Sequence, residues 1–220
     1  MTIRVSILLV VVATVAAPLR AQQDVAARLA GRVPQEVIAL VRQLSADAAA
    51  RGLPVEPLIQ KAIEGGAKAV PADRIAAAVR GVVVQLDGAA AALADAGLTP
   101  PDTETIAAGA FALNAGLDGR DVASLARVAG RANRATIALR VAGTLSALGV
   151  PAAETVTLVS EMMRAGRGPA ELTALPARLQ AEVARGATPA QAATGLARAA
   201  AAPGRSPQPP RRGPPPRPPN

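Results

Sequence analysis

The sequence contains no cysteine, histidine, tryptophan or tyrosine, and Phe111 is its one aromatic residue. Without cysteine the protein has no disulfide bonds and no thiolate metal sites. Without histidine it lacks the commonest ligand of zinc, copper and non-haem iron, and both serine–histidine and cysteine–histidine catalysis are excluded. Base stacking has almost no aromatic ring to use. These gaps predict a protein that is not an enzyme, carries no cofactor and does not bind nucleic acid.

Serine, lysine and carboxylates are present, so carboxylate catalysis, Ser–Lys pairs and oxygen-ligand sites for calcium or magnesium stay open. The sequence has no EF-hand loop, Walker A motif or G-x-S-x-G motif. More than half of its 16 acidic residues fall in or just before expected first turns of helices. Capping and the helix dipole explain acids at such positions without any chemistry. The sequence therefore nominates no catalytic, cofactor-binding or metal-binding residue.

Residues 1–21 have the pattern of a secretory signal peptide. Arg4 supplies a basic start, and residues 5–17 form an apolar run that is too short to span a bilayer comfortably. Ala21 then precedes a candidate cleavage point before Gln22. The pattern predicts export, to the periplasm or the medium. Cleavage of the leader and its retention as a short anchor are both compatible with it.

The formal net charge of +8 is concentrated outside the part of the chain that we expect to fold. Arg4 and Arg20 lie in the leader, and the C-terminal tail holds four further arginines and no acid. Residues 22–201 are therefore close to neutral. A near-neutral, exported domain is a further argument against nucleic-acid binding.

Residues 22–201 have the composition of an all-α protein. Good helix formers dominate, and short Gly/Pro segments separate them. At expected helix starts an apolar residue, a proline and an acidic or amide residue recur, as in Val33-Pro34-Gln35-Glu36. Proline fits a first helical turn, and an acid there faces the positive end of the helix dipole. We expect helices over 34–51, 54–67, 71–96, 101–115, 119–148, 151–165, 169–185 and 189–201, with a short one over 23–31.

A weak internal repeat emerges when Gly52, Gly97 and Gly149 are aligned. Each glycine opens a short helix that is followed by a second one. Hairpins at this period indicate an α-solenoid-like helical-hairpin repeat, and an irregular helical bundle with recurrent Gly–Pro turns is the alternative. The expected organisation is a signal peptide over 1–21, an all-helical domain over 22–201 with units of about 52–96, 97–148 and 149–185, and a tail over 202–220.

Two acidic residues occupy equivalent places in the first and third units. Glu64 and Glu161 each have a basic neighbour at helical spacing, Lys68 and Arg164 respectively. One interpretation is a polar patch that is repeated along one surface and faces a partner. The other is a pair of solvent-exposed intrahelical ion pairs, each contributing roughly a few tenths of a kcal/mol.

A row of arginines marks the expected helix over 119–148. Arg127, Arg131 and Arg134 fall at i, i+4 and i+7, so we expect them on one helix face. This basic face is a candidate contact for an anionic polymer or lipid headgroups. A charge row on a long helix is also simply its solvated side.

The tail is the least ordinary segment, because nine of the eighteen residues over 203–220 are proline. This composition predicts a disordered segment with a polyproline II bias. Its proline runs have the composition of ligands for aromatic grooves, and a solubilising spacer is the alternative. Its basic residues are candidates for weak attraction to anionic envelope polymers or membranes: Arg205, Arg211, Arg212 and Arg217.

Together these features predict a non-enzymatic, exported scaffold or interaction protein of the cell envelope with a protein partner. The alternative function is binding of an anionic envelope polymer or membrane surface through the arginine-rich tail and the basic helix face. The sequence identifies neither the partner nor the oligomeric state.

Overall fold

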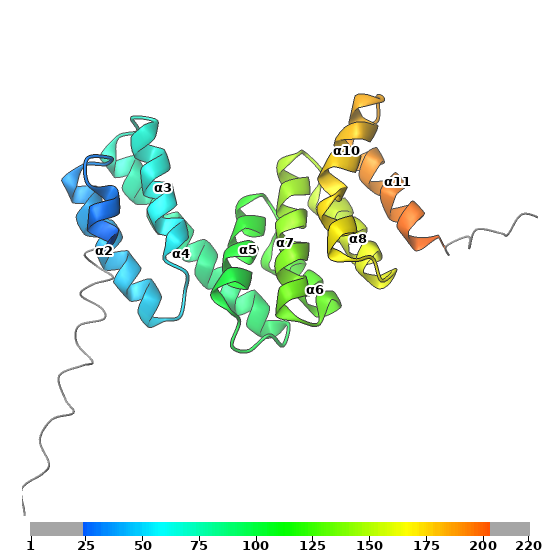
Figure 1. Cartoon of the computed structure of the whole chain (residues 1–220), viewed down its shortest axis with the longest axis horizontal. Helices are drawn as coiled ribbons and strands as arrows, with labels where there is room; N and C mark the ends of the chain where they lie inside the picture. Colours follow the sequence, from blue (N-terminus) through cyan, green and yellow to red (C-terminus); the bar gives the residue numbers. More distant parts are fainter. Residues whose placement is uncertain (1–23, 203–220) are drawn as a thin grey trace, which may run out of the picture.

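A computed structural model describes residues 24–202, and these residues form an all-α protein without strands (Figure 1). The expected all-α class is therefore confirmed for this part of the chain. The expected leader over 1–21 and the tail residues 203–220 lie outside the described residues. After a helical turn over 24–29, the helices are α2 (Gln35–Ala50), α3 (Glu56–Ala67), α4 (Ala72–Asp95), α5 (Thr103–Asn114), α6 (Gly119–Ala129), α7 (Ala132–Ala147), α8 (Ala152–Arg164), α9 (Pro169–Thr173), α10 (Leu175–Ala184) and α11 (Pro189–Ala201).

The aligned glycines of the sequence repeat all end helices. Gly52, Gly97 and Gly149 adopt φ values of 73°, 90° and 87°, a left-handed conformation that a residue with a Cβ rarely adopts. The N–H of the residue after each glycine donates to the carbonyl five positions earlier, at 2.9 to 3.1 Å. This is the Schellman geometry, which satisfies carbonyls left open at a helix end. The repeat in the sequence is thus a repeat of helix stop signals.

Two expected helices are each divided in two. The helix predicted over 119–148 is wrong, because Gly130 ends α6 with a φ of 69° and Arg131 starts α7 from an extended conformation. The helix predicted over 169–185 is interrupted at Ala174, just before Pro176 in the first turn of α10. A proline has no N–H with which to continue the preceding helical ladder.

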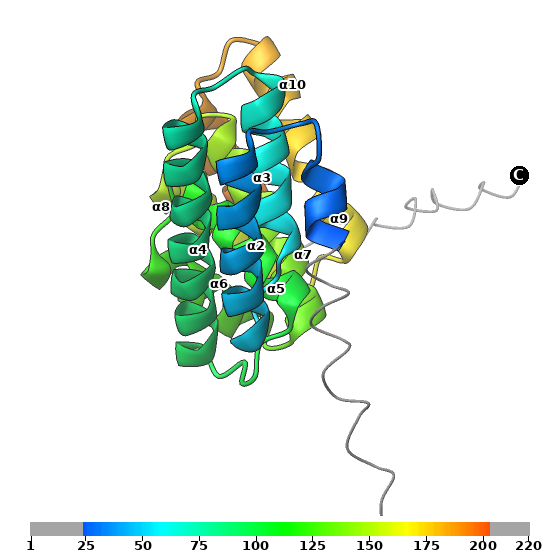
Figure 2. The same ribbon diagram turned by 90° about the vertical axis from the view of Figure 1, so that its left-hand side faces the viewer.

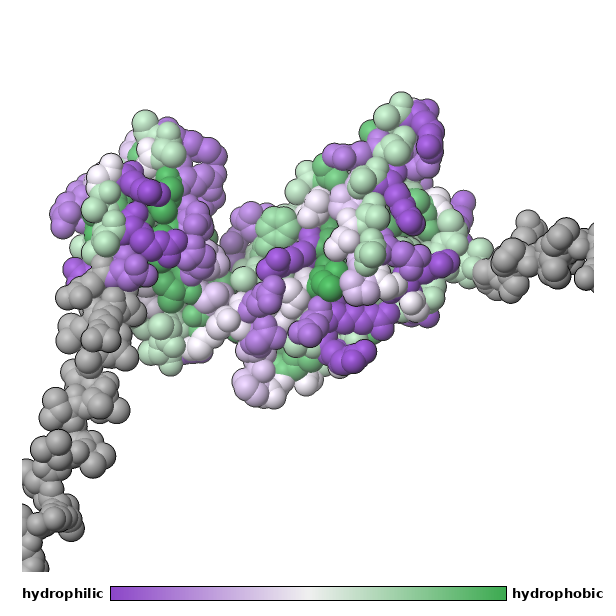
Figure 3. Space-filling model, viewed as in Figure 1, coloured by the Kyte–Doolittle hydropathy of each residue, from purple (hydrophilic) through white to green (hydrophobic). Residues whose placement is uncertain are grey.

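The helices pack in two rows along the long axis of the molecule (Figures 1 and 2). One row contains α2, α4, α6, α8 and α11, the other contains α5, α7, α9 and α10, and α3 packs against α2 and α4. Helix α4 packs against α2 and α3 with one part of its length and against α5 and α6 with the other. The surface is deeply hollowed between the part formed by α2 and α3 and the remaining helices (Figure 3). α4 is therefore the element that connects the two parts.

The core consists mainly of leucine, valine and alanine side chains. Alanines such as Ala89, Ala138 and Ala142 are fully buried, which lets neighbouring helices approach closely. At Gly143 on α7 the approach is closer still, because a Cβ there would lie 2.6 Å from ring atoms of Phe111 on α5. The core therefore depends on many small contacts.

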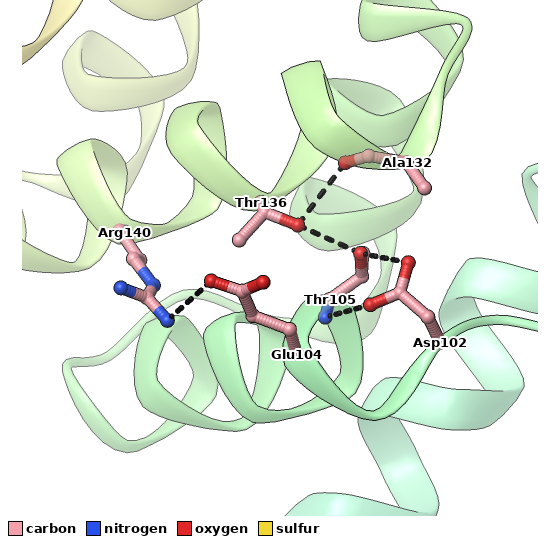
Figure 4. Close-up of polar contacts among 6 residues, drawn as sticks. All are labelled: Asp102, Glu104, Thr105, Ala132, Thr136 and Arg140. Carbon is pink, nitrogen blue, oxygen red and sulfur yellow. Dashed lines mark hydrogen bonds and ion pairs between the residues drawn. The ribbon is translucent and has the colours of Figure 1, made fainter.

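A buried hydroxyl pair joins α5 to α7 (Figure 4). The Oγ1 atoms of Thr105 and Thr136 are 2.7 Å apart, and both residues are buried. The carboxylate of Asp102 caps α5 by accepting the Thr105 N–H at 2.7 Å and lies 2.8 Å from the Thr105 hydroxyl. The Thr105 hydroxyl donates to Asp102, because a charged acceptor takes the stronger hydrogen bond. The Thr136 hydroxyl lies within reach of two acceptors, Thr105 Oγ1 and the Ala132 carbonyl oxygen at 3.1 Å. These hydrogen bonds fix how α5 and α7 are aligned along their lengths.

Candidate functional site

Both expected ion pairs form within their helices. Lys68 Nζ lies 2.5 Å from Glu64 Oε1, and Arg164 Nη1 lies 2.6 Å from Glu161 Oε1. Lys61, which the sequence argument left out, also bonds Glu64 at 3.1 Å. The hydrogen bond from Lys68 holds the pKa of Glu64 below its ordinary value. The two pairs lie at the end of α3 and on α8, in opposite halves of the molecule (Figure 1).

The three arginines of the expected basic row do not share a helix face. Arg127 lies on α6, whereas Arg131 is the N-cap of α7 and Arg134 lies in the first turn of α7. The left-handed turn at Gly130 changes the chain direction between them. Arg131 and Arg134 instead line a cleft, and Arg127 does not.

This arginine cleft, of about 610 Å³, lies between the first turn of α7 and the segment that joins α8 to α9. Arg167 contributes a third guanidinium from that segment. No acidic residue lines the cleft, and one wall is apolar through Ile137 and Leu172. The tertiary structure thus gathers three cations that the sequence places in two separate segments.

The three guanidiniums of the arginine cleft differ in the contacts that they make. Arg134 donates from Nη2 to the backbone carbonyl of Met163 at 2.6 Å, at the C-terminal end of α8. Arg167 makes a long contact of 3.4 Å with Glu171, whose other oxygen accepts the N–H of Gly168 at 3.1 Å. Arg131 is exposed and makes no ion pair with any residue in the range 24–202.

The start of α7 adds to the positive potential of the arginine cleft. α7 has no acidic residue in its first turn, and no side chain caps it. Free N–H groups at a helix start carry a partial positive charge. Arg131 therefore lies where the helix dipole disfavours a cation, and no nearby acid compensates for it.

A second, apolar pocket of about 430 Å³ lies between the helical turn over 24–29, α2 and α3. Short side chains such as Ala46 and Ala49 line it, and Ile59 forms part of its wall. At its edge Arg28 holds Glu56 by two bonds of 2.7 and 2.6 Å, which lower the pKa of the Glu56 carboxyl. Such a pocket has room for a small apolar group.

The outward face of α4 is apolar although it is exposed. We define the α4 stripe as Ala77, Gly81, Val84, Gly88 and Ala91, all of which are exposed, with Val84 at 70 %. Among residues 24–202, α4 is the one helix whose length and composition would allow it to cross a membrane, a test that core helices of soluble proteins also pass. Only 28 % of its most apolar window is buried. The core of this protein therefore accounts for only part of the apolar character of α4.

No group of three or more acidic side chains within the described range is placed to hold a metal ion. Comparisons with protein-family models, with curated proteins and with solved structures find no match to this chain.

Proposed function

We propose that this protein is an exported, non-enzymatic helical scaffold of the cell envelope that acts by contact with other protein chains. The observation that carries the proposal is the α4 stripe, an uncharged and exposed face in the middle of the longest helix. The partner that we propose for this face is a second copy of this chain, packed against the α4 stripe. The two rows of helices support the α-solenoid-like alternative for the domain, since hairpin stacks of that kind present extended surfaces to partners.

The two glycines of the α4 stripe support close packing by another helix. A Cβ at Gly81 would meet no atom within 4 Å, and at Gly88 it would make only an ordinary contact with Leu113 at 3.5 Å. A glycine inside a helix costs about 1 kcal/mol relative to alanine. Nothing within the fold requires Gly81, whereas a second backbone that packs against this face would.

The order of residues in the α4 stripe favours an antiparallel pair. The stripe reads Ala, Gly, Val, Gly, Ala with heptad-like spacing, and Ala77 and Ala91 lie seven residues before and after Val84. An antiparallel copy brings Val84 against itself and Gly81 to within one residue of Gly88. It also places Arg80 of each copy beside Asp87 of the other, on the same edge of the stripe. A parallel pair would instead place Arg80 beside Gln85 of the other copy, with no acid facing it.

A bilayer is a less suitable occupant of the same face. Arg80 and Asp87 lie in the middle of α4, and Asp87 binds Arg51 at the C-terminal end of α2 at 2.5 Å. Each charge at the centre of a membrane would cost about 2.5–3.5 kcal/mol on insertion scales. A protein partner leaves these charges at the edge of the contact, where water or a partner charge can reach them.

Single cysteines test this pairing cleanly, because the natural chain has none. In the full chain we expect Val84→Cys to form a disulfide-linked dimer on mild oxidation. Ala77→Cys alone should not, since its two copies would lie about 21 Å apart along the helix axes, beyond disulfide reach. A mixture of Ala77→Cys and Ala91→Cys should form the mixed dimer. Equal crosslinking of Ala77→Cys with itself would contradict the antiparallel pair.

Sedimentation measures the same association without a crosslink. The wild-type chain should show a concentration-dependent dimer, and Gly81→Leu should remain a monomer with unchanged helix content. A wild-type chain that stays monomeric at every concentration would overturn the self-association.

Cell fractionation tests export. We expect the protein in the periplasm or the medium, and a full-length chain recovered from the cytosol with its leader attached would contradict the cellular part of the proposal.

The second candidate function is binding of anionic envelope polymer or membrane surface, and the arginine cleft favours it within the described residues. The tail arginines would add to this attraction. Deletion of residues 203–220 should weaken salt-dependent retention on anionic vesicles, and unchanged retention would argue against a role for the tail.

A further inference from the structure

We infer that the arginine cleft between α7 and the α8–α9 segment is a binding site for a phosphate group. This inference rests on the second candidate function and names the chemistry and the residues of its ligand. Arg131, Arg134 and Arg167 converge on one cleft of about 610 Å³ from two separate segments of the chain. Their convergence is a property of the tertiary structure.

The charges around the cleft leave a clear excess of cations. The nearest acid that the structure pairs with a lining arginine is Glu171, and its contact with Arg167 is 3.4 Å long. One oxygen of Glu171 is already used to cap the start of α9 through Gly168. Three guanidiniums thus face one partly engaged carboxylate, and an incoming anion would relieve their mutual repulsion.

Arg134 is held in position in advance of binding. Its Nη2 is anchored to the Met163 carbonyl at 2.6 Å, and its side chain is half-buried. The guanidinium keeps further N–H groups that this bond does not use. An anchored guanidinium loses less side-chain entropy when an anion binds, which is how preorganisation raises affinity.

The start of α7 contributes backbone donors to the same cleft. Ala132 and Asn133 line the cleft beside Arg131, and α7 has neither an acid in its first turn nor a side-chain cap. Because Arg131 also occupies that helix start, its charge and the helix dipole add to one another. An anion in the cleft would satisfy the guanidiniums and the backbone N–H groups together.

The number of cations selects phosphate over carboxylate. Planar guanidiniums bind both anions with paired hydrogen bonds, but a phosphate monoester brings about two negative charges and more acceptor oxygens. The apolar wall of Ile137 and Leu172 lies beside the charged end and would contact the carbon skeleton that carries the phosphate. The site therefore suits an organic phosphate, either a soluble ester or a lipid headgroup.

Calorimetric titration of the full chain with inorganic pyrophosphate tests the site. We expect saturable binding that weakens with added salt, together with no heat from acetate. Arg131→Ala and Arg167→Ala should each weaken binding at least about tenfold, because each removes one charge-assisted contact. Arg120→Ala is the matched control, since Arg120 is an exposed arginine that does not line the cleft, and it should change affinity less than about twofold. Circular dichroism should show equal helix content in all variants.

Vesicles separate the two sources of phosphate. Retention of the wild-type chain on phosphatidic acid vesicles, whose headgroup is a phosphate monoester, identifies a headgroup if it is lost in Arg131→Ala, whereas pyrophosphate binding without vesicle retention identifies a soluble ester. Absence of pyrophosphate binding by the wild-type chain, or equal binding by the Arg131→Ala/Arg167→Ala double variant, would overturn the inference. Deletion of 203–220 tests the second candidate function separately, because that change leaves the cleft residues in place.

Discussion

Replacing Gly66 with alanine should unfold part of the N-terminal region. Gly66 lies in the last turn of α3, where a Cβ would overlap the backbone carbonyl oxygen of Arg32 and lie 2.8 Å from Val33 Cγ1. No side-chain rotation relieves a clash with a backbone atom. The segment that contains Arg32 must therefore move away from α3, and the helical turn over 24–29 moves with it.

The size of the effect follows from what that segment buries. Val25 and Leu29 anchor it and are 5 % and 0 % exposed. Burying such a side chain is worth about 1.5–3 kcal/mol, so undocking both costs about 3–6 kcal/mol. Alanine recovers about 1 kcal/mol through its better helix propensity. We expect a net loss of about 2–5 kcal/mol in the free energy of unfolding.

Gly195→Ala is the matched control for Gly66→Ala. Both glycines are helical, but a Cβ at Gly195 in α11 meets no atom within 4 Å. The same substitution there should stabilise the protein by up to about 1 kcal/mol. Urea denaturation followed by circular dichroism is the suitable assay, because the chain has no tryptophan or tyrosine to report by fluorescence. Two variants of equal stability, or a Gly66→Ala protein as stable as wild type, would refute the steric reasoning.

Three further predictions concern buried or capping polar groups. Thr136→Val should cost about 0.5–1.5 kcal/mol in urea denaturation, because it removes the bond between the two buried hydroxyls while Thr105 keeps its bond to Asp102, whereas Thr157→Val on the surface should cost less than about 0.5 kcal/mol. The hydrogen bond from the Thr105 N–H lowers the pKa of Asp102, so its stabilising effect is present above the unfolded-state pKa and is lost as the pH falls through the lower folded-state value; the stability difference between wild type and Asp102→Asn should therefore shrink in acid, and a constant difference would contradict this. Ser45→Ala should be neutral or stabilising by up to about 1 kcal/mol in thermal denaturation, because the buried Ser45 Oγ bonds to nothing within the described chain.

The helix boundaries follow largely from local signals. Glycine tolerates the left-handed conformation at helix ends, and an acid near a helix start is stabilised by the dipole, so both act within one turn of the chain. The same reasoning failed at Gly130, which resembles the tolerated interior glycine Gly81 in sequence. Whether such a glycine ends a helix depends on the packing that follows it, since α7 must turn to meet α5.

Helix α4 is amphipathic only in part. Ile75, Val79 and Leu86 recur at helical spacing in the sequence and are buried. The opposite face of α4 carries charged residues, so the sequence alone suggests a polar surface. The uncharged α4 stripe is recognised only when the exposure of each residue is known. Periodicity identifies the helix face that packs into the core, but it does not show that part of the exposed face lacks charged residues.

Composition and local spacing alone determined that this chain is helical, where most helices start and stop, and which chemistries its residues cannot perform. These properties depend on the backbone and on neighbours within a turn or two. The arginine cleft was decided only by the tertiary structure, because Arg134 and Arg167 are far apart in sequence and meet only when α7 packs beside α8 and α9. Contacts of that kind depend on how whole helices stack, which no short window of sequence encodes.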